Sequence, residues 1–81
     1  MTLTKEQCSD LKQRLYALSD FGGEKKVAEL AGVTTRVIQK VKTGGNVRVE
    51  TMEAILNALV ALEAERSHRL EKLGRILPPH P

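Results

Sequence analysis

The sequence has few cysteines to cross-link a small domain and few aromatic residues to fill its core. Its 81 residues include one cysteine, two aromatic residues and no tryptophan. A lone Cys8 cannot form an intramolecular disulfide, which excludes a disulfide-stapled secreted scaffold. Because 41% of the residues are apolar but only 2% are aromatic, the core must consist of Leu, Val, Ile and Ala. That composition favours small packed helices over a β-sandwich or barrel.

The chain also lacks a long hydrophobic run. Its longest apolar-rich stretch, residues 54–62, is interrupted by Asn57 and is too short to span a bilayer. The first ten residues carry Lys5, Glu6 and Asp10, so no signal peptide is expected. These features predict a single cytoplasmic domain without a membrane partner. So short a chain has little room for a deep substrate pocket beside its core, and we do not expect an enzyme.

Negative charge is scarce in the middle of the chain, where the net positive charge is concentrated. The formal charge is +3, but residues 23–48 hold six cations and two anions, which makes that segment +4 and the remainder −1. A basic segment of this kind is the electrostatic footprint of a polyanionic partner. A solvated, lysine-rich surface would give the same count, so charge alone does not decide between the two.

Helical spacing of the apolar residues predicts an all-α bundle of four to five helices. The first runs from Thr4 to about Ser19, where Thr4 and Gln7 have the spacing of a capping box and paired glycines follow the end. Its apolar stripe comprises Cys8, Leu11, Leu15 and Leu18. We therefore interpret Cys8 as a core residue and not as a redox sensor.

Two short helices are expected next, at about residues 24–31 and 34–42. Gly32 tolerates the left-handed position that ends the first, Val33 can fold back onto it, and Thr34 is a favourable N-cap for the second. The apolar face of the first comprises Val27, Leu30 and Ala31, and that of the second comprises Val37, Ile38 and Val41. The opposite side of the second helix carries three cations and no carboxylate, and consists of Thr35, Arg36, Gln39, Lys40, Lys42 and Thr43.

A fourth helix is expected from Val49 or Glu50, with one apolar face formed by Met52, Ile55, Leu56 and Leu59 and widened by Val60 and Leu62. After a polar stretch, apolar spacing resumes at Leu70, Leu73, Ile76 and Leu77. The pattern leaves open whether one long helix or two are present, with Ser67 capping the second. Pro78 and Pro79 forbid continuation, and His80–Pro81 is expected to be a frayed tail.

A helix, a tight glycine turn and a second helix with a cationic outer face are the physical requirements of a helix-turn-helix, whose second helix enters the DNA major groove. The run Val27–Gly44 resembles the Cro/C1-type helix-turn-helix family. Gly32-Val33-Thr34 is similar to that family's G-V-S turn, and Ile38 and Val41 match its buried recognition-helix positions. With Val49–Leu59 matching the fourth helix, the resemblance covers about residues 24–59.

The resemblance implies a lambda-repressor-like fold and a sequence-specific transcriptional regulator of double-stranded DNA. In such a protein, a homodimer binds a palindromic operator as a repressor, and small regulators of this kind serve phages or mobile elements, restriction–modification systems or antitoxins. The residues implied to read bases are Thr35, Arg36, Gln39 and Lys40. Those expected to contact phosphate are Thr34, Lys25, Lys26, Lys42, Thr43, Asn46 and Arg48. Gly23-Glu24 departs from the Thr-Gln that the family often shows, which puts a phosphate contact by Glu24 in doubt.

The C-terminal apolar residues exceed what a compact four-helix motif needs, so residues 1–66 are assigned to the DNA-binding domain and residues 67–81 to a C-terminal helix and tail. We expect Leu70, Leu73, Ile76 and Leu77 to form a dimer interface. The alternative is a fifth helix that folds back on its own subunit. The alternative function is a small helical adaptor, antiactivator-like or antitoxin-like, that keeps the fold without DNA binding. His68 and His80 are isolated, so we expect neither a metal site nor a cofactor.

Overall fold

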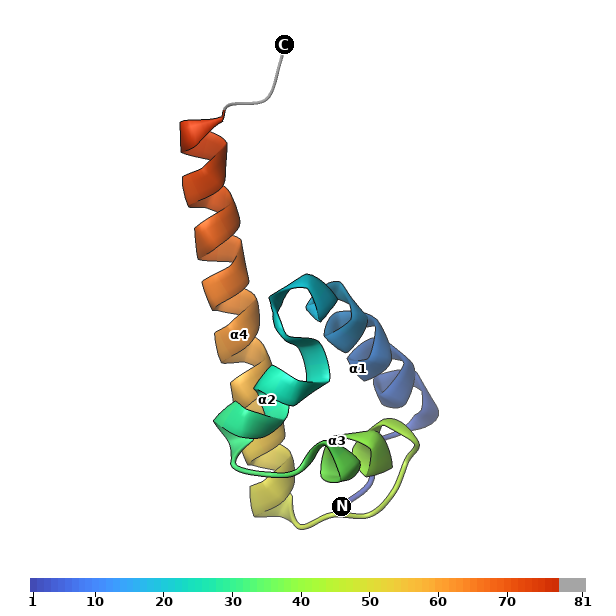
Figure 1. The fold of residues 1–81 in the computed structure, drawn as a ribbon. Coiled ribbons are helices and arrows are strands. Elements are labelled where there is room, and N and C mark those ends of the chain that lie inside the picture. Colours follow the sequence, from blue (N-terminus) through green and yellow to red (C-terminus); the bar gives the residue numbers. More distant parts are fainter. Residues whose placement is uncertain (78–81) are drawn as a thin grey trace.

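In the computed structural model, which describes residues 1–77, all regular structure is helical (Figure 1). This confirms the predicted all-α class. Three short helices gather beside the lower half of one long helix, and the end of the long helix extends beyond them. The elements are α1 (Lys5–Ala17), the single 3-10 turn η1 (Ser19–Phe21), α2 (Gly23–Ala31), α3 (Thr35–Lys42) and α4 (Val49–Ile76).

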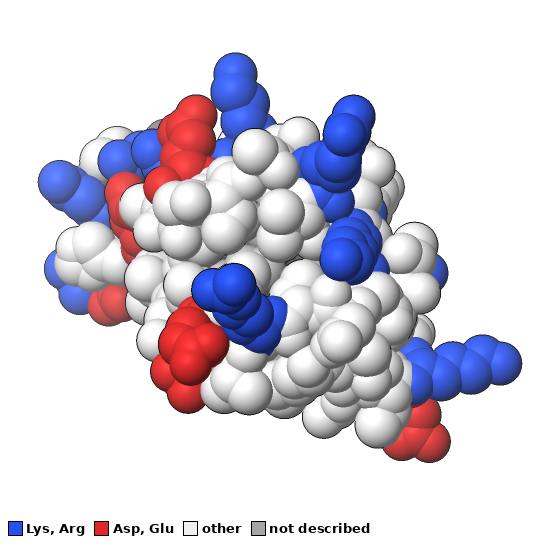
Figure 2. Space-filling view, turned by 90° about the horizontal axis from the view of Figure 1, so that it is seen from below, with Lys and Arg blue, Asp and Glu red and all other residues white. Residues whose placement is uncertain are grey.

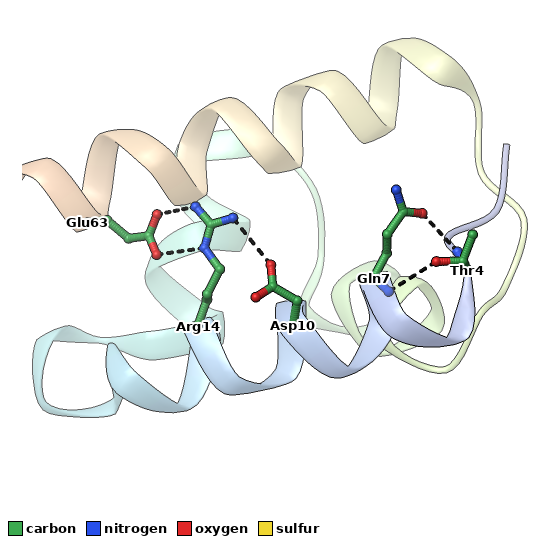
Figure 3. Close-up of polar contacts among 5 residues, drawn as sticks. All are labelled: Thr4, Gln7, Asp10, Arg14 and Glu63. Carbon is green, nitrogen blue, oxygen red and sulfur yellow. Dashed lines mark hydrogen bonds and ion pairs between the residues drawn. The ribbon is translucent and has the colours of Figure 1, made fainter.

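Helix α1 begins at the predicted capping box, drawn in Figure 3. The backbone N–H of Gln7 donates to Oγ1 of Thr4 at 3.1 Å, and the backbone N–H of Thr4 donates to Oε1 of Gln7 at 2.9 Å. These two bonds satisfy backbone donors that have no partner within the helix. The stripe Cys8, Leu11, Leu15 and Leu18 is buried as predicted, which places α1 against the other helices.

The core is aliphatic and takes residues from all four α-helices. Helix α2 packs across α4, and Ala28 is buried between them, as its small side chain allows. Two apolar predictions are wrong, because Leu30 is 51% and Val60 is 56% exposed. Helix α2 turns Val27 and the neighbouring Ala28 inward together, and this rotation carries Leu30 toward solvent. Val60 lies on the side of α4 that faces away from the bundle.

Helix α4 is continuous over 28 residues. At about 1.5 Å per residue, its length is about 42 Å, and it accounts for most of the molecule's 47 Å long axis. A second helix capped at Ser67 is therefore wrong, and the expected domain boundary after residue 66 falls inside one helix. The fold-back alternative is also wrong, since Leu70, Leu73, Ile76 and Leu77 are all exposed. Leu59 and Leu62, by contrast, belong to the bundle's own core.

Expectations for Pro78, Pro79, His80 and Pro81 lie outside the described residues. Within residues 1–77, no helix is both long and apolar enough to cross a membrane.

Three side-chain contacts hold α4 against α1 and η1, just C-terminal to the core residues of α4. Nε of Arg14 donates to Glu63 at 2.8 Å, and Asp10 lies on the other side of the same guanidinium (Figure 3). Higher along α4, Nε of Arg66 donates to Asp20 at 3.0 Å. The guanidinium of Arg69 then lies 4.8 Å from the ring centre of Phe21 in η1. The hydrogen bonds from Arg14 and Arg66 lower the pKa of Glu63 and of Asp20, respectively.

Candidate nucleic-acid interface

The turn between α2 and α3 forms as the local sequence predicts. Gly32 adopts the left-handed conformation with φ 73° and ψ 29°, which a side chain would strain. The N–H of Val33 donates to the carbonyl of Ala28 at 2.9 Å, and its side chain packs against the core. Thr34 then caps α3 by accepting from the N–H of Val37 at 3.4 Å. The turn therefore fixes how α3 is presented relative to α2.

The end of α3 is closed by a second glycine turn. The N–H of Gly45 donates to the carbonyl of Lys40 at 2.8 Å. A Cβ atom at Gly45 would lie 2.8 Å from that same carbonyl oxygen and 2.4 Å from Cγ of Lys40. Only glycine allows so close an approach. Consequently the chain leaves α3 sharply and does not cover its outer face.

Helix α3 is divided into two faces. Ile38 and Val41 are fully buried and hold the helix against the core. The four side chains expected to read bases are all exposed on the outer side, and they are Thr35, Arg36, Gln39 and Lys40. Within residues 1–77, no carboxylate lies within ion-pair distance of Arg36 or Lys40. From below, Figure 2 shows separated Lys and Arg side chains around a largely uncharged surface.

Lys42 does not lie on that open face, contrary to prediction. Its Nζ forms an ion pair with the carboxylate of Glu24, and only about a quarter of each side chain is exposed, 25% and 26% respectively. The contact joins the end of α3 to the beginning of α2. A Lys42 contact with phosphate is therefore disfavoured, because Nζ already has a carboxylate partner. The same pairing offsets the negative charge of Glu24.

Two further predicted phosphate contacts are engaged within the molecule. Oγ1 of Thr43 donates to the carbonyls of Gln39 and Lys40, at 3.1 Å each, so its hydroxyl hydrogen is not available to a phosphate. Oδ1 of Asn46 accepts a hydrogen bond from the N-terminal ammonium of Met1. That ammonium also donates to the carbonyl of Val47 at 2.7 Å.

The other predicted phosphate contacts stay available. Lys25 and Lys26 are exposed on α2, and Arg48 is exposed directly before α4. Thr34 is exposed at the N-terminus of α3, where the helix dipole favours an anion. These four residues come from three places in the chain, namely α2, the N-cap of α3 and the residue before α4.

Open hollows lie on both sides of α3. One separates α3 from α1 and is lined on the α1 side by the polar residues Lys12, Gln13 and Tyr16. Its other side includes Gln39 and the Glu24–Lys42 ion pair. The other is lined by Val37 and Lys40 of α3 and by the segment Asn46–Thr51 together with Met1. Sequence reasoning did not select the three α1 residues. Their polarity shows that they avoid the core, but only the packing of α1 against α3 shows which surface they share.

Tyr16 is one of the residues that sequence reasoning missed. It is the only tyrosine of the chain, and 81% of its surface is exposed at the rim of the hollow between α1 and α3. A lone exposed aromatic residue is a signal that could have been noticed, since aromatic side chains with a polar tip are favoured at interfaces.

The described part of the chain holds no cluster of three or more His, Cys, Asp or Glu side chains that could bind a metal ion. Comparison of the chain with protein-family models, with curated proteins and with solved structures found no match.

Proposed function

We propose that this protein is a sequence-specific DNA-binding transcriptional regulator that inserts α3 into the major groove. The observation that carries the proposal is the outer face of α3, where Thr35, Arg36, Gln39 and Lys40 are exposed together and no carboxylate of residues 1–77 pairs with the two cations. The major groove is about 12 Å wide and admits one α-helix. Occupying a promoter excludes other proteins from it, so repression is the expected sign of regulation.

The side-chain types on this face match base edges. Arg36 and Lys40 can donate to O6 and N7 of guanine, and Gln39 can form a bidentate pair with adenine. Thr34 directs the N-terminus of α3 toward a phosphate, where backbone N–H groups and the helix dipole favour an anion. Base contacts would thus come from the middle of α3 and positioning contacts from its start.

The hollows beside α3 fit the two phosphate backbones that border a major groove. On one side, Lys12 and Tyr16 can contact phosphate from α1, beside Glu24, whose charge is offset by its ion pair with Lys42. On the other, Arg48 provides positive charge. Contacts of this type fix the position of a protein on the duplex without reading its sequence. They replace Lys42, Thr43 and Asn46, which have partners within the molecule.

An electrophoretic mobility shift with DNA from the region upstream of the protein's own reading frame tests the proposal. Arg36→Ala should lower affinity for the preferred site about 5- to 150-fold, the range for losing one good base contact, and should relax specificity at one position. Lys12→Ala should weaken all sequences equally and reduce the salt dependence by about one phosphate. Lys72→Ala, on the far half of α4, is the matched control and should change neither.

Absence of a shift by the folded wild-type protein at low salt would overturn the proposal. A shift that Arg36→Ala and Lys40→Ala leave unchanged would show that α3 does not read the bases.

The adaptor function is the second candidate, because the free end of α4 exposes four apolar side chains. The dependence of binding on salt concentration distinguishes the DNA-binding function from the adaptor function. DNA binding through several phosphates weakens steeply with salt, whereas an apolar protein interface does not.

A further inference from the structure

The apolar face of α4 continues in a straight line beyond the bundle. Eighteen residues make about five full helical turns, so residues 18 apart point in the same direction. Each apolar residue near the C-terminal end follows a buried residue by that interval, in the pairs Met52 and Leu70, Ile55 and Leu73, Ala58 and Ile76, and Leu59 and Leu77. We name Leu70, Leu73, Ile76 and Leu77 the α4 tip. The tip therefore repeats, on the same side of the helix, the pattern that binds α4 to the core.

The bundle covers only the lower part of this face. Its uppermost contact in the described residues is the Arg69 guanidinium over Phe21. Above it the tip residues are 48% to 82% exposed, and Figure 1 shows this end of α4 standing clear of α1 and η1. The tip extends a helix that is already formed, but its four apolar side chains gain nothing from burial while they face water. A second apolar surface that covered them would stabilise the tip.

We propose that the α4 tip of a second copy of this chain covers it, with the two helices antiparallel and centred near Leu73. A parallel pair is blocked, because below the tip the same face of each α4 is already occupied by its own α2. In an antiparallel pair, each bundle lies beyond the free end of the other copy's α4. The two bundles then do not compete for space.

Charge also favours this arrangement. The last turn of α4 has backbone carbonyls without partners in the helix, and they carry partial negative charge. In the antiparallel pair, this end arrives beside Arg69 and Arg66 of the other copy, at the upper edge of the bundle. Both arginines already pair with carboxylates, Arg69 with Glu65 and Arg66 with Asp20, but each guanidinium has further N–H donors for the carbonyls. Four side chains per copy make an interface well below the standard of about 800 Å² per partner, so the dimer is reversible and depends on concentration.

The dimer has a consequence that rests on the proposed function. Leu73 lies 24 residues after Val49, so the starts of the two α4 helices are about 72 Å apart along the pair, and each α3 lies at its own end. One DNA turn is about 34 Å. The separation is therefore close to two turns, so this dimer does not fit half-sites one turn apart and would contact half-sites two turns apart on one duplex or two separate DNA segments.

Sedimentation of the protein without DNA tests the association, so failure here is separate from failure of DNA binding. Leu73→Glu should raise the dimer dissociation constant at least about 30-fold, the effect of an interface hot spot. His68→Glu introduces the same side chain on the opposite side of α4 and should leave the constant unchanged. Helix content should stay the same in both, since both sites are exposed. A wild-type protein that stays monomeric up to millimolar concentration would overturn the proposal, as would equal effects of the two variants.

Orientation is tested by the distance between spin labels at Ala61→Cys in a Cys8→Ala background, after both changes are shown to preserve helix content. Ala61 is exposed and lies 12 residues before Leu73. The antiparallel dimer predicts about 36 Å between the two positions along the helices. A separation of about 20 Å, two helix diameters, would show a parallel pair and contradict the proposal.

Discussion

The two halves of α4 have the same apolar pattern and opposite surroundings. Between Met52 and Leu62 the apolar face is buried against α1, α2 and α3, whereas the α4 tip repeats that face in the open. Both halves belong to one continuous helix. The difference teaches that an amphipathic pattern shows which side of a helix avoids water, but not what covers it. A helix face that is buried within its own chain and one that is buried by a partner show the same apolar pattern in the sequence.

The largest expected effect is on the free energy of unfolding, which should fall when a leucine is replaced in the packed half of α4 and not when one is replaced in the tip. Leu59→Ala leaves a cavity in the core and should lower the free energy of unfolding by about 2–5 kcal/mol. Leu73→Ala removes a side chain that is 58% exposed and should change it by less than about 0.5 kcal/mol in the monomer. Urea unfolding at a protein concentration low enough to keep the chain monomeric measures both. Equal losses would mean that the tip folds against its own bundle in solution.

The ion pairs Arg14–Glu63 and Arg66–Asp20 lie between the packed half of α4 and its tip. They should make the free energy of unfolding depend on pH. The pKa of Glu63 is lowered by its hydrogen bond with Arg14, and the pKa of Asp20 by its hydrogen bond with Arg66. A carboxyl with a depressed pKa in the folded state stabilises it above its unfolded pKa. That stabilisation is lost as the pH falls through the folded value.

Urea midpoints should therefore fall as the pH is lowered from 6 to 3, and the double variant Glu63→Gln/Asp20→Asn should show a smaller fall. Glu53→Gln, an exposed carboxyl without an ion pair within residues 1–77, is the control. Identical pH dependence in the double variant and the wild type would show that these contacts do not fasten α4.

The smallest expected effect is a change in amide hydrogen exchange that is confined to the α4 tip. A Cβ at Gly74 would meet nothing within 4 Å, and alanine is favoured over glycine in a helix by about 1 kcal/mol. Gly74→Ala should thus slow amide hydrogen exchange in the last two turns of α4 and leave exchange around Ile55 unchanged. Faster exchange at the tip, or slower exchange throughout the molecule, would contradict the independence of the two halves.

Local chemistry made much of the fold predictable. The capping box at Thr4, the left-handed Gly32 and the N-cap at Thr34 each depend on neighbours within a few residues, and each was identified from the sequence. The exposed face of α3 followed from helical periodicity. These features required only the residue type and its spacing.

Contacts between distant residues were not predictable in the same way. Lys42 pairs with Glu24, which is 18 residues away, and Asn46 pairs with the N-terminus, which is 45 residues away. Both were predicted to contact phosphate from their positions in the resemblance to the helix-turn-helix family. Leu30 was placed in the core because its spacing from Val27 is helical, but the crossing of α2 over α4 selected Ala28 instead.

The central claim is that the outer face of α3 binds DNA. Amide chemical shifts of isotope-labelled protein, titrated with the duplex selected by mobility shift, test it most directly. The account predicts the largest changes at Thr35–Lys42, smaller changes at Lys12 and Tyr16 across the hollow, and none at the α4 tip. Changes confined to the tip, or none in α3 at saturation, would contradict it.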